Sequence, residues 1–364
     1  MVANDFTPES LPCFIGRMSG LEALALPPDL QAWDCRATRV AWAGLQADGF
    51  MAAARQASAV YGASRVGLVL GTSSSTIGAS EQAYAALAAD GGFPEALRQE
   101  RLNTPHALAL FVQQVLGLGG ACVTVSTACS SSAKAFAQAE RWLRLNLADA
   151  VVVGGVDALS RSLLFGFRAL CLLSDEPCRP FDAARRGISI GEAAGFALLK
   201  REPADWQLLG YGESNDAHHM SSPHPQGLGA ELALDDALAR AGIEASAVDY
   251  LNLHGTASVL NDEVEAAVVA RRYAAHVHAS ATKGVTGHAM GAAGIVEALI
   301  CGLALRDGLL AGTAGTGRPD AALGTQFGAQ LRLPPAQRRV RLAASHSFGF
   351  GGNNAVLIFG CGES

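Results

Sequence analysis

The chain has 364 residues, more than a single hydrophobic core usually supports, which predicts two domains or one duplicated domain. Half of the residues are hydrophobic and only 16% are charged, so much of the chain is expected to be buried. The net charge of -6 at pH 7 provides no basic surface for nucleic acid, and we expect no nucleic-acid partner.

In the first half, β-branched runs alternate with Ala-rich segments of helical period. The predicted elements are a strand at Val66–Leu70 closed by Gly71, a helix at Glu81–Ala89, a strand at Ala121–Ala128, a helix at Ser130–Leu145 and a strand at Ala150–Val156. The last three form a βαβ unit. Such units predict a parallel sheet with right-handed crossovers and helices on its faces.

The alternation begins again near Trp206. The predicted elements of this second series are a strand at Val248–Leu253, a helix at Asp262–Arg272, a strand at Val277–Ala281, a helix at Gly291–Arg306 and paired strands within Arg341–Phe359. The boundary is placed where the buried-looking run Gly195–Leu199 gives way to Lys200–Asp205. We therefore predict an N-terminal half of residues 1–203 and a C-terminal half of residues 204–364. Because no low-complexity linker separates them, the halves are expected to share an interface.

Several other classes of protein are not expected. The eight cysteines include no CxxC pair and no ligand-like grouping with histidine, so neither a disulfide framework nor a metal site is predicted. The first residues lack a basic segment before an apolar stretch, and no uncharged apolar run of about 18 residues follows. These features predict a cytoplasmic protein without a membrane span. Nucleotide binding is not expected either, because the sequence has neither GxxxxGK[ST] nor a strand-GxGxxG-helix unit.

Cys129 follows a predicted strand and precedes a predicted helix, in the segment Val125-Ser-Thr-Ala-Cys-Ser-Ser-Ser. The unpaired amides and positive dipole end of that helix would lower the pKa of the thiol and favour the thiolate. Position alone favours a different interpretation, a small buried hydrophobic residue. The choice between them depends on which residues the fold brings near the sulfur.

Three segments of the second half are predicted to end strands: Asn252–Thr256, Ser280–His288 and Ser345–Asn354. In open α/β sheets, ligands gather beyond the carboxyl ends of the strands. A single histidine at such a place is more often structural, and His276 and His278 keep that interpretation. Two histidines in Gly-flanked turns opposite one cysteine favour a catalytic site. Glycines around Phe350 would free the backbone to expose amides and to move as a hinge.

At these residues the sequence resembles the elongating, Cys-His-His type of β-ketoacyl synthase in the thiolase-like superfamily. The resemblance runs in order from about Val66 onward. Its motifs are Thr127-Ala-Cys-Ser, Cys178-Arg-Pro-Phe-Asp with Gly187 and Gly191-Glu, Asp216-Ala-His-His-Met, His254-Gly-Thr with Asn261-Asp and Glu265, Lys283 with Thr286-Gly-His288 and Gly291-Ala-Ala-Gly, and Ser347-Phe-Gly-Phe-Gly-Gly.

This resemblance implies an α/β fold, a duplicated βαβαβαββ unit in five layers, α-β-α-β-α, assembled as a homodimer or as a heterodimer with a related subunit. The site residues that it implies are Cys129 as nucleophile, His254 and His288 as the histidine pair, Lys283 as supporting lysine, Glu265 as the polar partner of that lysine, Phe350 as gate, and Thr256 with Ser258 as the pair that binds the pantetheine arm.

The implied reaction is a decarboxylative Claisen condensation of an acyl-Cys129 intermediate with a malonyl thioester. Backbone N–H groups of Cys129 and Phe350 would form the oxyanion hole, and neutral His254 and His288 would donate Nε2–H bonds as CO2 leaves. Substrates would arrive on the phosphopantetheine arm of acyl carrier protein, with no cofactor and no metal. The route would be fatty-acid, polyketide or polyene biosynthesis.

The sequence departs from the family pattern in places. His346 stands where Asn is usual, Ser258 replaces Thr, and no clear opening strand precedes Val66. A chain-length-setting subunit without condensing activity remains an alternative, although such subunits usually lack the nucleophile. A thiolase and a Cys-His-Asn synthase are disfavoured, because the Gly-rich loop at Phe350 has no cysteine and residue 288 is histidine. A fixed aromatic wall remains the alternative to a moving Phe350.

Overall fold

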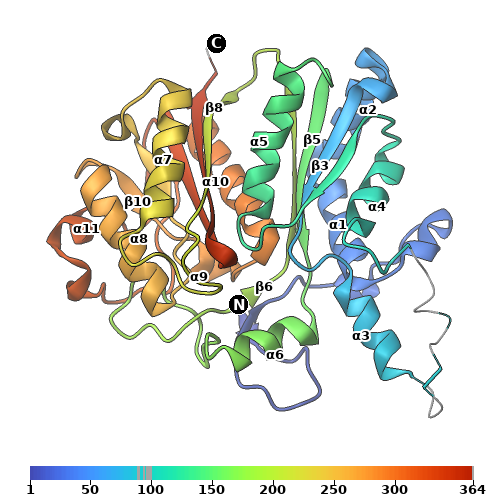
Figure 1. The fold of residues 1–364 in the computed structure, drawn as a ribbon, viewed down its shortest axis with the longest axis horizontal. Helices are drawn as coiled ribbons and strands as arrows, with labels where there is room; N and C mark the ends of the chain where they lie inside the picture. Colours follow the sequence, from blue (N-terminus) through green and yellow to red (C-terminus); the bar gives the residue numbers. More distant parts are fainter. Residues whose placement is uncertain (88–90, 93–94, 96–100, 363–364) are drawn as a thin grey trace.

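The computed structural model describes residues 1–87, 91–92, 95 and 101–362, and it has five layers (Figure 1). The first outer layer contains α1 (Arg36–Gln46), α2 (Phe50–Tyr61) and α4 (Ala107–Leu116), and it covers a four-stranded sheet. The central layer is formed by α5 (Ser131–Arg144) and α10 (Ala293–Asp307). A five-stranded sheet follows, and α7 (Leu228–Ala241) and α8 (Val259–Arg272) cover its far face. The predicted α-β-α-β-α architecture is confirmed.

The first sheet has the order β4-β3-β5-β7. Its strands are β3 (Val66–Gly71), β4 (Cys122–Val125), β5 (Ala150–Asp157) and β7 (Ala193–Lys200). β3 lies parallel to β4 and β5, whereas β7 is antiparallel to β5. Every residue of β3 and β5 is buried, because helices cover both faces of the sheet.

The second sheet repeats this pattern with the order β10-β9-β13-β14-β8. Its strands are β8 (Trp206–Asn215), β9 (Tyr250–Asn252), β10 (His278–Ser280), β13 (Leu342–Gly349) and β14 (Asn353–Cys361). Again three strands are parallel, and the next one, β14, is antiparallel. β8 has no counterpart in the first sheet as described, in agreement with the missing opening-strand signal before Val66.

The remaining elements lie at the rim of the layers. They are β1 (Val2–Ala3), β2 (Phe14–Gly16), α3 (Ile77–Ala85), α6 (Arg161–Ala169), β6 (Ile190–Gly191), α9 (Lys283–Thr286), β11 (Leu309–Leu310), α11 (Thr325–Gln330) and β12 (Ala336–Gln337). β2 joins β1 to β6 in a small separate sheet. In the described part of the chain, no helix is both long enough and apolar enough to cross a membrane.

Several predicted boundaries differ from the structure by a few residues. The predicted helix Glu81–Ala89 is observed as α3, which begins at Ile77, and residues 88–89 of the prediction lie outside the described residues. The predicted strand Ala121–Ala128 ends at Val125, because the chain then turns and Ala128 adopts a left-handed φ of 51°. The chain passes from one sheet to the other between Lys200 and Trp206. The division into domains 1–203 and 204–364 stays a prediction.

The two halves share a hydrophobic core between the sheets. Side chains from both halves pack together there, including Phe136 of α5, Ile295 of α10 and Phe359 of β14. Gly155 of β5 allows this packing, because an added Cβ would lie 2.5 Å from a methyl group of Ile295. A continuous core fixes the halves relative to each other, so the ends of their strands form one fixed site.

Candidate active site

Cys129 lies in the turn between β4 and α5, and it is only 6% exposed. Ala128 has a left-handed backbone conformation, and the turn that it makes places Cys129 just before α5, which begins at Ser131. The end of β13 passes close by, since a Cβ added to Gly349 would lie 3.1 Å from the backbone nitrogen of Cys129. The turn therefore brings the sulfur to the ends of strands from both sheets.

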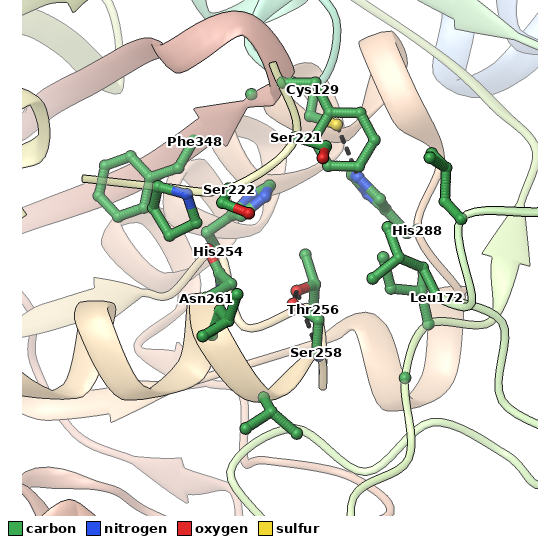
Figure 2. A pocket seen from close by; sticks show the side chains of 18 of the residues that line it. Cys129, Leu172, Ser221, Ser222, His254, Thr256, Ser258, Asn261, His288 and Phe348 are labelled. Carbon is green, nitrogen blue, oxygen red and sulfur yellow. Dashed lines mark hydrogen bonds between the residues drawn. The ribbon is translucent and has the colours of Figure 1, made fainter. Parts of the chain in front are cut away.

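His288 contacts this sulfur directly. Its Nε2 lies 3.0 Å from Cys129 Sγ, as the dashed line in Figure 2 shows. The backbone of His288 is held by two bonds to the first half: its N–H donates to Ser189 O over 2.7 Å, and its carbonyl accepts from Gly191 N over 2.9 Å. Contacts between the halves thus set the position of the imidazole.

His254 completes a group of three side chains in one buried space. It follows β9, and its ring centre lies 5.4 Å from that of His288. A ring nitrogen of each histidine and the sulfur of Cys129 lie within 4.8 Å of one another. Because Nδ1 of His254 faces Lys283 Nζ at 3.4 Å, Nε2 is the nitrogen available to a substrate.

The ion-pair partner of Lys283 is Glu297, and the prediction that this partner is Glu265 is wrong. Lys283 Nζ contacts the carboxylate of Glu297 on α10 and also donates to His254 O over 2.5 Å. Both side chains of the ion pair are 2% exposed. The lysine extends from α9 toward the central layer, where α10 supplies the carboxylate.

Glu265 instead holds the backbone of His254 in place. Its two carboxylate oxygens accept from His254 N over 2.7 Å and from Gly255 N over 2.8 Å. Glu265 lies on α8, the helix that follows the turn carrying His254. Glu265 therefore supports the histidine through its backbone and does not act through the lysine.

The expected low pKa of the Cys129 thiol is also incorrect. Burial raises the pKa of Cys129 to about 11, although Lys283 and the backbone N–H of Phe350 act in the opposite direction. Removal of the sulfur from water outweighs these two effects. In this substrate-free state, Cys129 is a protonated thiol at neutral pH.

Both histidines are neutral. Burial lowers the pKa of His254 and of His288 well below the usual value, and Lys283 lowers each pKa further. A neutral imidazole can donate from one nitrogen while the other accepts a bond. The pair thus provides donors without adding charge.

A cavity of about 380 Å³ opens from these three residues toward the surface. Thr256 and Ser258 line one wall and lie beside each other, with 3.0 Å between their hydroxyl oxygens (Figure 2). Leu172 and Phe348 line other parts of the cavity. Ser221, Ser222 and Asn261 line the cavity as well, so it offers hydroxyl and amide groups beside apolar side chains. Such a lining suits a long arm that carries a few amide groups.

Phe350 borders the same cavity at the end of β13. Its backbone N–H points at the sulfur of Cys129, and its ring stacks on Phe167 of α6 with 5.7 Å between ring centres. The following Gly351 and Gly352 have φ values of 72° and 71°, which favour glycine. Backbone donor and aromatic ring thus lie on one tight turn.

Sequence reasoning missed Glu297 and Phe167. Glu297 had a detectable signal, because it is the acidic residue within the otherwise apolar run Gly294–Leu303. A carboxylate there must be buried and needs a cation. Phe167 had no such signal, since α6 was not predicted.

A buried thiol and two neutral imidazoles on a duplicated five-layer fold define a thiol-dependent acyl-transferring enzyme of the thiolase-like class. Comparisons with known proteins make the assignment specific. Residues 30–204 match the family model "Beta-ketoacyl synthase, N-terminal domain", and residues 207–316 match "Beta-ketoacyl synthase, C-terminal domain". The chain belongs to the β-ketoacyl synthase family, whose members are condensing acyltransferases.

Individual relatives agree with this assignment. Nodulation protein E of Rhizobium meliloti is 36% identical over 307 residues, which cover 81% of this chain and 75% of that protein. A 3-oxoacyl-[acyl-carrier-protein] synthase 2 from the same species is 38% identical over 257 residues, covering 65% and 59% of the two chains. The structure of the ketosynthase ApeO of Xenorhabdus doucetiae, solved with its chain length factor ApeC, is 35% identical, with a TM-score of 0.88. That match covers 99% of this chain and 89% of ApeO.

Proposed function

We propose that this enzyme condenses an acyl-Cys129 intermediate with malonyl-acyl carrier protein and releases 3-oxoacyl-acyl carrier protein and CO2. The observation that carries the proposal is the contact of 3.0 Å between Cys129 Sγ and His288 Nε2, with His254 in the same buried space. A thiol in this setting can accept an acyl group, and the two imidazoles can stabilise the negative charge of an enolate.

In the first step, Cys129 Sγ attacks the carbonyl carbon of an acyl thioester. A new C–S bond forms, the bond to the pantetheine sulfur breaks, and that leaving sulfur takes up the thiol proton, so His288 keeps its Nε2–H for the second step. The backbone N–H groups of Cys129 and Phe350 stabilise the tetrahedral oxyanion. Each donor of this kind contributes about 3–4 kcal/mol in enzymes where it has been removed.

In the second step, a malonyl thioester takes the place of the departed carrier. The bond to its carboxylate breaks, CO2 leaves, and the electron pair moves onto the thioester oxygen, where His254 and His288 donate Nε2–H bonds. The enolate carbon attacks the acyl carbonyl, the new C–C bond forms, and Cys129 leaves as a thiolate that takes a proton from water. Neutral imidazoles suit this step because they donate without being consumed as acids.

The substrates would be delivered on the phosphopantetheine arm of acyl carrier protein, with Thr256 and Ser258 binding the arm. The reaction as proposed needs no resident cofactor and no metal, since Cys129 carries the acyl group itself. Because ApeO was solved with its chain length factor, we propose a homodimer or a heterodimer with a related subunit. The pathway, whether fatty-acid, polyketide or polyene synthesis, and the cytoplasmic location stay predictions.

The test is stepwise intact-mass spectrometry with acyl carrier thioesters of varied length and unsaturation. We expect one acyl group on the wild-type chain, absent from Cys129→Ala, and its release as a 3-oxoacyl thioester once malonyl carrier is added. An unmodified Cys129 under conditions that load a known ketosynthase would contradict the proposal. It would support the alternative, a chain-length-setting subunit without its own condensing activity.

Replacing either histidine should remove a donor from the enolate. We expect His254→Ala and His288→Ala each to lower the rate of malonyl decarboxylation at least about a hundredfold, because charge then develops in a dry site without a partner. Release of CO2 from malonyl carrier measures this rate. His278→Ala, a change at a buried histidine on β10, serves as the control and should retain most of the activity.

A further inference from the structure

His346 is a fully buried histidine that lies behind the reaction site. It stands on β13, two residues before Phe348, and its ring centre lies 5.1 Å from that of Phe348. Both of its ring nitrogens have partners: Nδ1 lies 3.1 Å from Glu265 Oε1, and Nε2 lies 2.9 Å from Tyr273 OH. The two condensation steps assign no role to this side chain.

The chemistry of the partners sets the direction of these hydrogen bonds. Burial raises the pKa of Tyr273, so its phenol keeps the proton and donates to Nε2 of His346. The remaining nitrogen, Nδ1, then carries a ring hydrogen and donates to Glu265 Oε1. Tyr273 thereby fixes the tautomer of His346.

Glu265 connects His346 to His254 by hydrogen bonds. The Oε1 atom that accepts from His346 also accepts from His254 N, and Oε2 accepts from Gly255 N. Gly255 has a φ of 38°, so the turn that carries His254 is in the left-handed region and depends on these bonds for its shape. A change at Tyr273 or His346 therefore alters the orientation of the His254 imidazole.

We propose that Tyr273 and His346 form a positioning relay which, through Glu265, holds His254 in line with Cys129 for the decarboxylation step. This inference rests on the proposed function and concerns residues that do not touch substrate. An asparagine at position 346 could supply a donor to Glu265 but has a shorter side chain. We therefore expect it to leave the hydroxyl of Tyr273 without a partner.

The experiment compares Tyr273→Phe, His346→Asn and His346→Leu with His278→Leu as the matched control at another buried histidine. The kcat and KM for decarboxylation of malonyl carrier are measured, and ¹⁵N NMR of the histidine-labelled full chain reports tautomers. For His346→Leu we expect kcat to fall by about tenfold or more at unchanged KM, as for a lost buried hydrogen bond. His346→Asn should recover part of this loss, because its amide can still donate to Glu265.

Tyr273→Phe provides a second test. It removes only the hydroxyl group, so the variant is expected to fold. We expect it to alter the ¹⁵N shifts of His346 and His254 together while acylation of Cys129 persists. Unchanged His254 resonances in both Tyr273→Phe and His346→Asn would overturn the relay. So would equal losses of kcat in His346→Leu and His278→Leu. An inactive wild-type chain refutes the proposed function instead, and the NMR comparison still decides the relay.

Discussion

Lys283 is a buried cation whose Nζ lies between the carboxylate of Glu297 and the imidazole of His254. A positive charge at this distance opposes protonation of the imidazoles, and it lowers the pKa of both His254 and His288. Without the lysine, Glu297 would also remain as a buried carboxylate with no cation. Lys283 therefore acts on the charge state of the site and not as a proton donor to substrate.

Lys283→Met tests this role. Removing the cation raises the pKa of both histidines, and because the neutral form is active, activity should be lost at a higher pH as the solution is acidified. The pH at which decarboxylation is lost on acidification should therefore move upward, and the fall in rate should be confined to the acidic end of the pH profile. Lys200→Met, at an exposed strand end, is the control. A pH profile that stays in place would show that Lys283 serves only to neutralise Glu297.

Among the helices and strands, the packing of α5 against the first sheet fixes the position of the nucleophile Cys129. A Cβ at Gly71 of β3 would lie 2.3 Å from backbone atoms of Ser132, in the first turn of α5. Only glycine allows the strand and the helix start to approach so closely. The position of Cys129, three residues before Ser132, therefore depends on this contact.

Gly71→Ala should push the start of α5 away from β3. We expect a loss of about 1–3 kcal/mol in the free energy of unfolding, as for other overpacked cores, together with slower acylation of Cys129. Chemical denaturation and intact-mass kinetics measure the two effects. Gly78→Ala on α3 is a matched control, because the nearest atom to its new Cβ is 3.8 Å away. Equal stability of the two variants would mean that α5 shifts without cost.

The stack between Phe167 of α6 and Phe350 links a second element to the site. Such aromatic pairs contribute about 0.5–1.5 kcal/mol. Phe167→Ala should therefore change the fraction of molecules in which the Phe350 ring keeps its observed position by up to about tenfold. If Phe350 moves during acylation, the rate of acyl transfer to Cys129 should change by a similar factor. Phe165→Ala on the same helix is the control, since Phe165 is 38% exposed. An unchanged rate would support the fixed aromatic wall.

At the scale of the whole molecule, β4 is an edge strand of the first sheet, and among the described strands it pairs with β3 alone. Val123 at its middle is 37% exposed. An uncovered edge with an apolar side chain is suited to pairing with another chain. The described fold thus offers an edge for the proposed dimeric assembly.

Val123→Arg should weaken that assembly, because a charge would be buried at the new interface. By light scattering we expect the wild-type chain at twice its mass of 37.5 kDa, or at the mass of a heterodimer when the related subunit is co-expressed, and the variant nearer the single mass. Val60→Arg, at a residue of α2 that is 66% exposed, is the control. A variant that assembles as well as the wild type would place the interface elsewhere.

The alternation of strands and helices, the two-half organisation and the candidates Cys129, His254 and His288 could all be predicted from the sequence alone. These predictions follow from local periodicity and from short motifs, which depend only on residues close together in the sequence.

The sequence did not predict the partner of Lys283 or the high pKa of Cys129. Glu265 and Glu297 are both acidic residues on predicted helices, and only packing against α10 shows which one the lysine reaches. A pKa depends on burial, and Cys129 is removed from water by segments as distant in sequence as His288. Contacts across 159 residues are decided by how the two sheets pack on their shared helices, and that is a property of the tertiary structure.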